Sequence, residues 1–160
     1  MSEKPTEGRR HKLKMTTSIE LDYLRSQAVW YLKHFLLTPY LWAGNDFAGL
    51  DCSGLVIEVL QSVGILEHGS DYTANDLYLK FKDKKRDKPC FGSLAFWFKN
   101  GKATHVEMIV DELHCIGASG GDSKTKTVED AIRQNAFVKM RPVNYRGVNY
   151  KIVDPFKVGE

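Results

Sequence analysis

The residue best suited to do chemistry in this sequence is Cys52, which stands in Asp51-Cys52-Ser53-Gly54 directly before an apolar stretch. Apolar residues recur at helical spacing after it, so the thiol lies at a predicted helix start. Unpaired backbone N–H groups and the positive end of the helix dipole favour an anion there, and therefore the thiolate. Such a thiolate indicates nucleophilic catalysis if the fold brings a base to it.

Histidine is the usual base for a cysteine nucleophile, and His105 is the best placed of the five in the sequence. It opens an alternating strand that can lean over the helix that Cys52 begins. Three of the other four lie in a charged N-terminal stretch, late in the first predicted helix and in a loop, namely His11, His34 and His68. We therefore expect a Cys52–His105 pair.

The cysteines indicate neither a metal site nor a disulfide scaffold. Cys52, Cys90 and Cys115 have spacings that match no zinc pattern, and an odd, sparse set does not suit a cross-linked small domain. We expect no metal and no cofactor.

Composition favours an ordinary globular protein without nucleic acid as a partner. Of 160 residues, 42% are hydrophobic and 27% charged, and a net charge of +3 is too small to argue for nucleic-acid binding. Basic residues gather within 4–14 and 80–88, which we interpret as a leader and a solvated loop, or alternatively as attraction to an anionic cell envelope. The sequence has no apolar run long enough for stable membrane insertion and no signal-peptide h-region. These features predict synthesis in the cytoplasm without a signal peptide.

Patterning along the chain predicts an α+β fold. Residues 1–15 are interpreted as a flexible basic leader and 16–160 as one catalytic domain. Helices are expected from a capping box at Thr17 to Pro39, over 52–63, over 73–81 and over 127–134. Strands are expected over 93–98, 104–110, 113–118, 137–141 and 150–153, with a hairpin at Asn100-Gly101. N-terminal helices followed by a meander predict helices packed on a central antiparallel sheet.

Four segments of the sequence together resemble the NlpC/P60 cysteine peptidases. They are Pro39-Tyr40-Leu41-Trp42-Ala43-Gly44, Asp51-Cys52-Ser53-Gly54-Leu55-Val56, Gly92-Ser93-Leu94-Ala95-Phe96-Trp97 and His105-Val106-Glu107-Met108-Ile109-Val110. The tail, with Gly117-Ala118-Ser119-Gly120-Gly121-Asp122-Ser123, Arg141-Pro142 and Asp154-Pro155-Phe156, is similar to compact phage and prophage members.

The resemblance implies a papain-like fold and a role for each matching residue. Cys52 would be the nucleophile and His105 the base. Tyr40 would hydrogen-bond near the nucleophile or the oxyanion, or alternatively be a core aromatic. Asp51 and Ser53 would shape the turn and substrate site, or serve only as helix caps. The backbone N–H of Cys52 or Ser53 would help bind the oxyanion.

The sequence departs from the family at the residue that orients the base. The family has a third polar residue, often histidine, on the strand after the base, and alignment puts Gly117 there. A two-residue turn at 111–112 would place Ile109 opposite His114, whereas a three-residue loop would place His105 opposite Gly117. Both keep His114 out of reach. Glu107 lies on the face of His105, where the family usually has a small residue, and is the possible substitute. A water or a backbone carbonyl is the other alternative.

The resemblance implies a cysteine endopeptidase that cuts peptidoglycan stem peptides between D-glutamate and a diamino acid, through an acyl-enzyme. We expect it to be phage tail-associated or lytic, with phage tail proteins as further partners, and delivered to the cell wall. The alternatives are an injected antibacterial amidase effector, a catalytically weak binding or assembly module, and acyl transfer on a lipid or amide.

Overall fold

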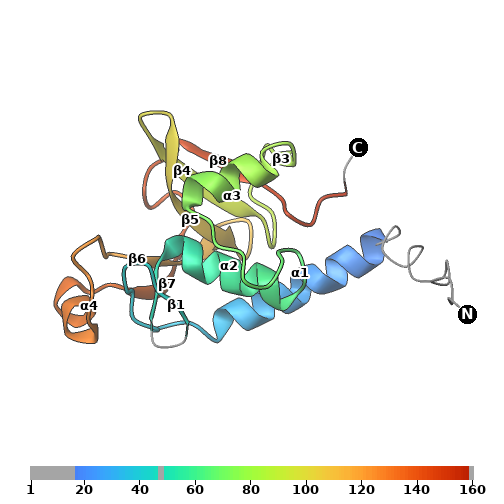
Figure 1. The fold of residues 1–160 in the computed structure, drawn as a ribbon. Coiled ribbons are helices and arrows are strands. Elements are labelled where there is room, and N and C mark those ends of the chain that lie inside the picture. Colours follow the sequence, from blue (N-terminus) through green and yellow to red (C-terminus); the bar gives the residue numbers. More distant parts are fainter. Residues whose placement is uncertain (1–16, 47–48, 159–160) are drawn as a thin grey trace, which may run out of the picture.

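The computed structural model describes residues 17–46 and 49–158, so the predicted leader 1–15 lies outside the described residues. Its elements form an α+β fold of helices and one large antiparallel sheet (Figure 1). The helices are α1 Ser18–Lys33, α2 Cys52–Ser62, α3 Ala74–Phe81 and α4 Val128–Gln134. The large sheet contains β3 Lys85–Arg86, β4 Leu94–Lys99, β5 Lys102–Ile109, β6 His114–Ser119, β7 Phe137–Pro142 and β8 Tyr150–Val153. The predicted fold class is confirmed.

The sheet has the strand order β3-β8-β4-β5-β6-β7, with every neighbouring pair antiparallel. The strands β4, β5, β6 and β7 follow the chain, whereas β8, the last strand in sequence, inserts between β3 and β4. Asn100 and Gly101 join β4 to β5 with positive φ at both residues, as the predicted hairpin requires. The base candidate therefore lies on a strand in the middle of the sheet.

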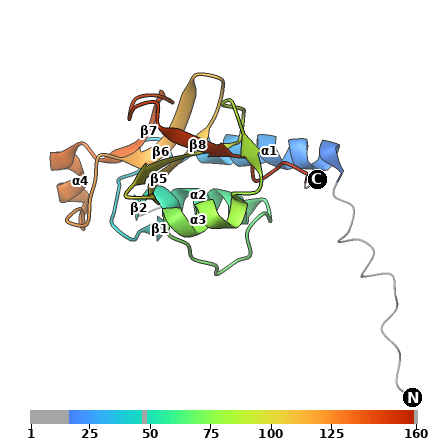
Figure 2. The same cartoon turned by 90° about the horizontal axis from the view of Figure 1, so that it is seen from above.

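Each face of the sheet has its own core. Helices α2 and α3 lie on one side (Figure 2), where α2 contacts β5 and β6, and α1 packs on α2. The apolar face of α2 contributes Leu55, Val56, Val59 and Leu60 to that core. On the other side, a smaller cluster gathers around Trp97 and Cys115 beneath the segment between β7 and β8. The buried side chain of Glu107 lies on this second face, so protein and not water surrounds its carboxylate.

Local sequence signals explain where three helices begin. Thr17, Thr73 and Thr127 each cap a helix, and in each case an acid three residues later completes a capping box. The predicted end of the first helix at Pro39 is wrong, because α1 ends at Lys33. Leu37 takes a φ of 70° and donates its N–H to the Val138 carbonyl, so bonding to β7 prevails over continuation of the helix.

Short strands occur where the sequence predicted only loops and turns. Within the basic run 80–88, β3 pairs with β8, and Arg86 reaches the buried carboxylate of Asp154. Arg25 of α1 binds the same carboxylate, which ties the first helix to the end of the chain. Before α2, β1 Asn45–Asp46 pairs with β2 Gly49–Leu50. Backbone pairing of this kind leaves little trace in side-chain patterning.

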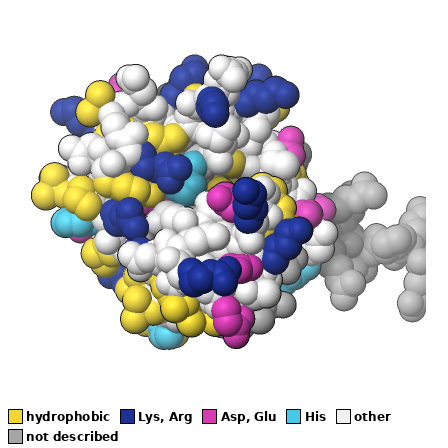
Figure 3. Space-filling model, turned by 90° about the vertical axis from the view of Figure 1, so that its left-hand side faces the viewer, with side chains coloured by type: hydrophobic (Ala, Val, Ile, Leu, Met, Phe, Trp, Pro, Cys, Tyr) yellow, Lys and Arg dark blue, Asp and Glu magenta, His cyan; other side chains and the backbone are white. Residues whose placement is uncertain are grey.

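Charged and hydrophobic side chains are interspersed on the face seen in Figure 3. Lys and Arg side chains lie there among acidic, uncharged and hydrophobic ones. In the described ranges, no helix combines the length and the apolar character needed to cross a bilayer.

Candidate active site

Cys52 is the first residue of α2, and its neighbours hold the turn before it. Asp51 is the N-cap, and its Oδ1 accepts hydrogen bonds from the N–H of Gly54 at 2.7 Å and the hydroxyl of Ser53 at 3.3 Å. Its Oδ2 accepts the N–H of Ala43 at 3.1 Å. Burial raises the pKa of Asp51 despite these bonds. Asp51 is thus a helix cap, as one interpretation of the sequence had it, and Ser53 takes part in the same cap.

Close packing at Gly54 brings the preceding loop onto the helix that carries the thiol. A Cβ added to Gly54 would lie 2.1 Å from the carbonyl oxygen of Gly44. Only a residue without a side chain allows this approach. The glycine of the Asp51-Cys52-Ser53-Gly54 motif therefore determines where the loop before Cys52 lies.

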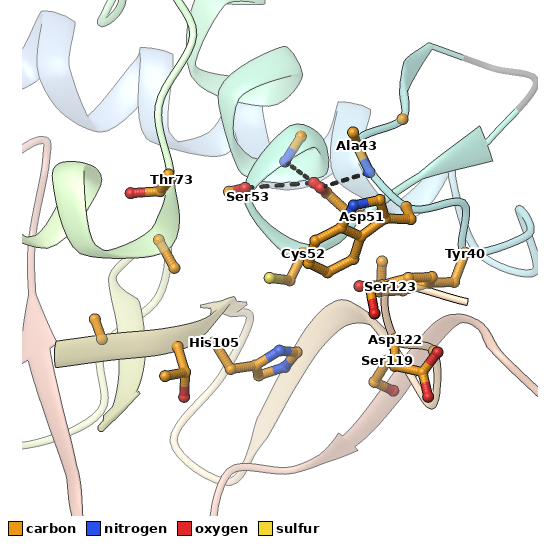
Figure 4. Close-up of a pocket in the computed structure, with 18 of the residues that line it drawn as sticks. Tyr40, Ala43, Asp51, Cys52, Ser53, Thr73, His105, Ser119, Asp122 and Ser123 are labelled. Atoms are coloured by element: carbon orange, nitrogen blue, oxygen red, sulfur yellow. Dashed lines mark hydrogen bonds between the residues drawn. The ribbon is translucent and has the colours of Figure 1, made fainter. Parts of the chain in front are cut away.

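His105 lies on β5 and faces the same space as Cys52 (Figure 4). Its side chain is buried, with the Trp97 ring 5.6 Å away between centroids. Burial alone works to lower the pKa of His105, but polar interactions with Cys52 and Glu107 outweigh it and hold the pKa above its usual value. The structure thus brings the predicted nucleophile and base together and favours the protonated imidazole.

Glu107 is the partner of His105 on the side away from the thiol. Its carboxylate is 1% exposed, and Oε1 lies 2.8 Å from Nε2 of His105. The same oxygen accepts the Tyr145 hydroxyl at 2.7 Å, and Oε2 accepts the Cys115 thiol at 2.9 Å. Burial works to raise the pKa of Glu107, but these donors and the charge of His105 hold it below its usual value. An ionised acid therefore receives the Nε2 hydrogen.

Gly117 lies on β6 against this acid. A Cβ on Gly117 would come within 2.2 Å of Glu107 Cγ and 2.8 Å of its Oε1. The register pairs Met108 with Ile116 and Ile109 with Cys115, so both predicted registers are wrong. Of the alternatives for the partner of His105, the structure has Glu107, and the glycine leaves it room.

His114 does not reach the site, as both predicted registers required. It begins β6 beside the turn, and its Nδ1 lies 3.0 Å from both carboxylate oxygens of Asp111. Asp111 Oδ1 also accepts the N–H groups of Leu113 and His114. These bonds make a three-residue turn of 111–113. This is one of the two expected turn lengths, but the pairing of His105 with Gly117 expected for it is wrong, because the turn pairs Ile109 with Cys115.

Tyr40 belongs both to the core and to the site. It is 6% exposed, and its ring lies against the backbone of Gly121, so the core-aromatic interpretation describes it in part. Its side chain also lines the pocket that Cys52 and His105 line (Figure 4). Burial, followed by the nearby charges of Cys52 and Asp51, raises the pKa of Tyr40, so the hydroxyl keeps its hydrogen and can donate.

One cleft of about 960 Å³ is lined by Tyr40, Asp51, Cys52, Ser53 and His105. Its walls come from the loop before α2, the segment before α3, the start of β5 and the loop after β6. Charged residues that the sequence did not single out also line it, namely Asp71, Asp76, Lys99, Asp122 and Arg146. In the part of the chain that the structure describes, no three or more His, Cys, Asp or Glu side chains are grouped to hold a metal.

The sequence model of the NlpC/P60 family matches residues 37–142. The chain belongs to the NlpC/P60 family. A comparison with curated protein sequences gives no match.

Solved structures place the chain in the same fold. An NlpC/P60 family protein from Bacillus cereus superposes with a TM-score of 0.66 at 23% identity, over 83% of this chain and 40% of the other. The peptidoglycan hydrolase RipB from Mycobacterium tuberculosis gives 0.67 at 20% identity, over 98% and 74%. The NlpC/P60 domain of the peptidoglycan hydrolase SagA gives 0.58 at 21%, over 81% and 97%. The chain thus spans less than half of the Bacillus protein and nearly all of the SagA domain.

Sequence reasoning also missed the two further hydrogen-bond partners of Glu107 in this NlpC/P60 site, Tyr145 and Cys115. Cys115 had a signal, because it lies two positions from Gly117 and so shares its face of β6. Tyr145 had none, because it lies 38 residues from Glu107 in a segment without a motif.

Proposed function

We propose that this NlpC/P60 protein hydrolyses the stem peptides of bacterial peptidoglycan with Cys52 as nucleophile and His105 as base. The observation that carries the proposal is the meeting of a helix-start thiol and a Glu107-bonded imidazole in one cleft. The two structural neighbours named as peptidoglycan hydrolases support the substrate class.

The arrangement suits attack on an amide carbonyl. His105 takes the proton of the Cys52 thiol, and the thiolate adds to the carbonyl carbon. Backbone N–H groups at the start of α2 and the protonated Tyr40 hydroxyl are donors for the resulting oxyanion. His105 then gives its proton to the leaving amine as the C–N bond breaks, which leaves a thioester on Cys52. Water, deprotonated by His105, hydrolyses the thioester and restores the thiol.

Glu107 takes the part of the orienting residue in this scheme. A carboxylate can only accept, so its bond fixes the hydrogen on Nε2 and leaves Nδ1 to exchange a proton with the thiol. Its negative charge also stabilises the imidazolium formed during the reaction. The proposed site is therefore a Cys–His–Glu triad in which two members come from the same strand.

The finer parts of the proposal concern the bond and the setting. We place the cut between D-glutamate and the diamino acid, as the family resemblance implies. The segments within 117–156 that resemble phage and prophage members support an enzyme that is associated with the phage tail or active in lysis. Such an enzyme would be delivered to the cell wall and contact phage tail proteins. An injected antibacterial amidase effector is the alternative, and tail genes or an immunity gene beside the coding sequence would distinguish the two.

Digestion of purified peptidoglycan tests the enzyme proposal. Wild type should release fragments whose masses identify the bond, and Cys52→Ala should release none beyond background. Defined stem peptides with free and with blocked N-termini then show whether cleavage requires a free N-terminus. Release of the same fragments at the same rate by wild type and Cys52→Ala would contradict the proposal.

A binding or assembly module is the second candidate. It is favoured by the glycine at position 117, where the family resemblance implies a polar residue, and opposed by the bond between Glu107 and His105. Selective alkylation of Cys52 separates the candidates, because an activated thiolate reacts quickly near neutral pH. The enzyme proposal expects Cys52 to react faster than Cys90, a half-buried free thiol. Equal, slow labelling would favour the binding module.

A further inference from the structure

The carboxylate of Glu107 accepts three hydrogen bonds on the buried second face of the sheet, and two come from outside β5. Tyr145 reaches it from the segment between β7 and β8, and Cys115 from β6. A carboxylate removed from water is costly unless donors replace the lost solvent. The residues that supply those donors therefore decide whether Glu107 stays ionised.

We propose that Tyr145 is a positioning residue that keeps Glu107 ionised and directed at His105. The proposal rests on the role of His105 as base under the proposed function. It adds the segment between β7 and β8 to the residues on which catalysis depends.

The hydrogen bonds of Tyr145 and His105 meet on one oxygen. Oε1 lies 2.7 Å from the phenol oxygen and 2.8 Å from Nε2 of His105, so the two donors fix the carboxylate together. Burial, followed by the charge of Glu107, raises the pKa of Tyr145, so the phenol stays protonated and can only donate to this acid. A bond to an ionised acceptor is about twice as strong as one between neutral groups.

The Tyr145 ring is itself held in place. The Arg141 guanidinium lies 4.8 Å above its centroid and that of Arg146 5.8 Å, while Trp97 packs at 6.1 Å. Trp97 also packs on His105, so one aromatic cluster contacts both partners of Glu107. The hydroxyl donates to Glu107 and accepts a longer hydrogen bond, 3.4 Å, from Nη1 of Arg146. Removal of the hydroxyl therefore takes away these two bonds and leaves the packing of the ring.

Cys115 secures the other oxygen of the same carboxylate. Burial, followed by the charge of Glu107, raises the pKa of Cys115, which therefore remains a thiol and a donor. A thiol is a weak donor. We therefore assign the larger part of the stabilisation to Tyr145.

The test is Tyr145→Phe, with Tyr150→Phe as the matched control. Tyr150 packs on the same Trp97 ring at 5.8 Å, and among the described residues no hydrogen bond joins it to Glu107. The rate of Cys52 alkylation by iodoacetamide is followed against pH by mass spectrometry of the Cys52 peptide, which needs no peptidoglycan. Kinetics on stem peptides are measured in parallel.

Loss of the phenol donor raises the pKa at which Glu107 takes a proton, so the ion pair with His105 fails from a higher pH. For Tyr145→Phe we expect the acid limb of the alkylation profile to move up by about one pH unit. We expect kcat to fall about tenfold with KM unchanged, since the residue does not touch substrate. Tyr150→Phe should overlay the wild type.

Two results would overturn the proposal. One is a Tyr145→Phe profile that overlays the wild type, whatever the change in melting temperature. The other is a full tenfold loss when Tyr145→Phe is added to Glu107→Gln, because a residue acting through Glu107 has no further effect once the acid is gone. If wild type leaves peptidoglycan intact while the alkylation profile still shifts, the proposed function fails and this inference stands.

Discussion

Gly117 of β6 lies so close to Glu107 of β5 that a Cβ on the glycine would be 2.2 Å from Cγ of the acid. The family resemblance implies a small residue at the position of Glu107 and a polar one at that of Gly117. Here the two are exchanged, so the side chain that meets the imidazole comes from the strand of the base itself. The departure from the family pattern is thus that the large polar residue lies on β5 and the small one on β6, and His105 keeps a hydrogen-bond partner.

Gly117→Ala is expected to lower kcat/KM by about 10- to 100-fold, since the new methyl group must push the Glu107 carboxylate away from His105. Overpacking should also cost about 1–3 kcal/mol of the free energy of unfolding. Urea unfolding and stem-peptide kinetics measure both effects. In the double variant Glu107→Ala/Gly117→Ala the clash disappears, so stability should rise while activity stays low. Unchanged kinetics for Gly117→Ala would contradict the assigned role of Glu107.

The double variant Glu107→Ala/Gly117→His should be at least about tenfold more active than Glu107→Ala alone. Removal of the acid opens the space on β5, and a histidine on β6 then faces His105 from the position that the family uses. Gly117→His without the second change should be poorly stable, because its side chain meets Glu107. Stem-peptide kinetics on the three variants decide the matter. Equal activity of the double variant and Glu107→Ala would argue against an exchange of roles.

Glu107→Gln should narrow the pH range of activity from the alkaline side. Glu107 helps to hold the pKa of His105 above its usual value, so without its charge the imidazolium is lost at a lower pH. Stability changes in the matching sense. The His105 contribution is present below its unfolded pKa and is lost as pH rises through the folded one. The Glu107 contribution is present above its unfolded pKa and is lost as pH falls through the depressed one.

Profiles of kcat/KM and of Cys52 alkylation against pH test this expectation. Asp111→Asn is the control, because Asp111 also bonds a histidine, His114, but in an exposed turn. It should leave both profiles unchanged. An alkaline limb that stays in place in Glu107→Gln would show that the acid does not govern the protonation of His105.

Asp154→Asn is expected to lower the free energy of unfolding by about 3–5 kcal/mol. The carboxylate is fully buried and binds Arg25 at 2.8 Å and Arg86 at 2.7 Å, so the amide removes the buried charge that both guanidinium groups share. Asp22→Asn is the matched control. Asp22 pairs with the same Arg25 at 3.6 Å but is 75% exposed, so its loss should cost less than about 1 kcal/mol. Urea unfolding measures both, and equal effects would contradict this assignment.

Local signals predicted the elements of this fold better than the contacts between them. Capping boxes at Thr17 and Thr73 mark helix starts because both hydrogen-bonding partners lie within four residues. The Asn100-Gly101 turn is likewise local, since both residues tolerate positive φ. The end of α1 depends instead on a bond between Leu37 and β7, about a hundred residues away in sequence, so no local pattern reports it.

The candidate site shows the same division. Cys52 and His105 could be predicted from a helix start and an alternating strand. Glu107 could be named as a substitute because strand periodicity puts it on the face of His105. The register of β6 was not predicted. A three-residue loop was one of two alternatives, but the choice between them depends on Asp111, which accepts two backbone N–H groups, and the pairing expected for that loop was wrong. Tyr145 depends on a segment whose path only the complete sheet defines.

The insertion of β8 between β3 and β4 has a consequence for the order in which the protein matures. During synthesis β4 emerges long before β8, and until residues 150–153 arrive it lacks one of its two neighbours. The segment that carries Tyr145 lies just ahead of β8 and is anchored by it on that side. A nascent or C-terminally trimmed chain therefore holds Cys52 and His105 without the completed support of Glu107. The support of Glu107 is therefore completed only after residues 150–153 have been translated.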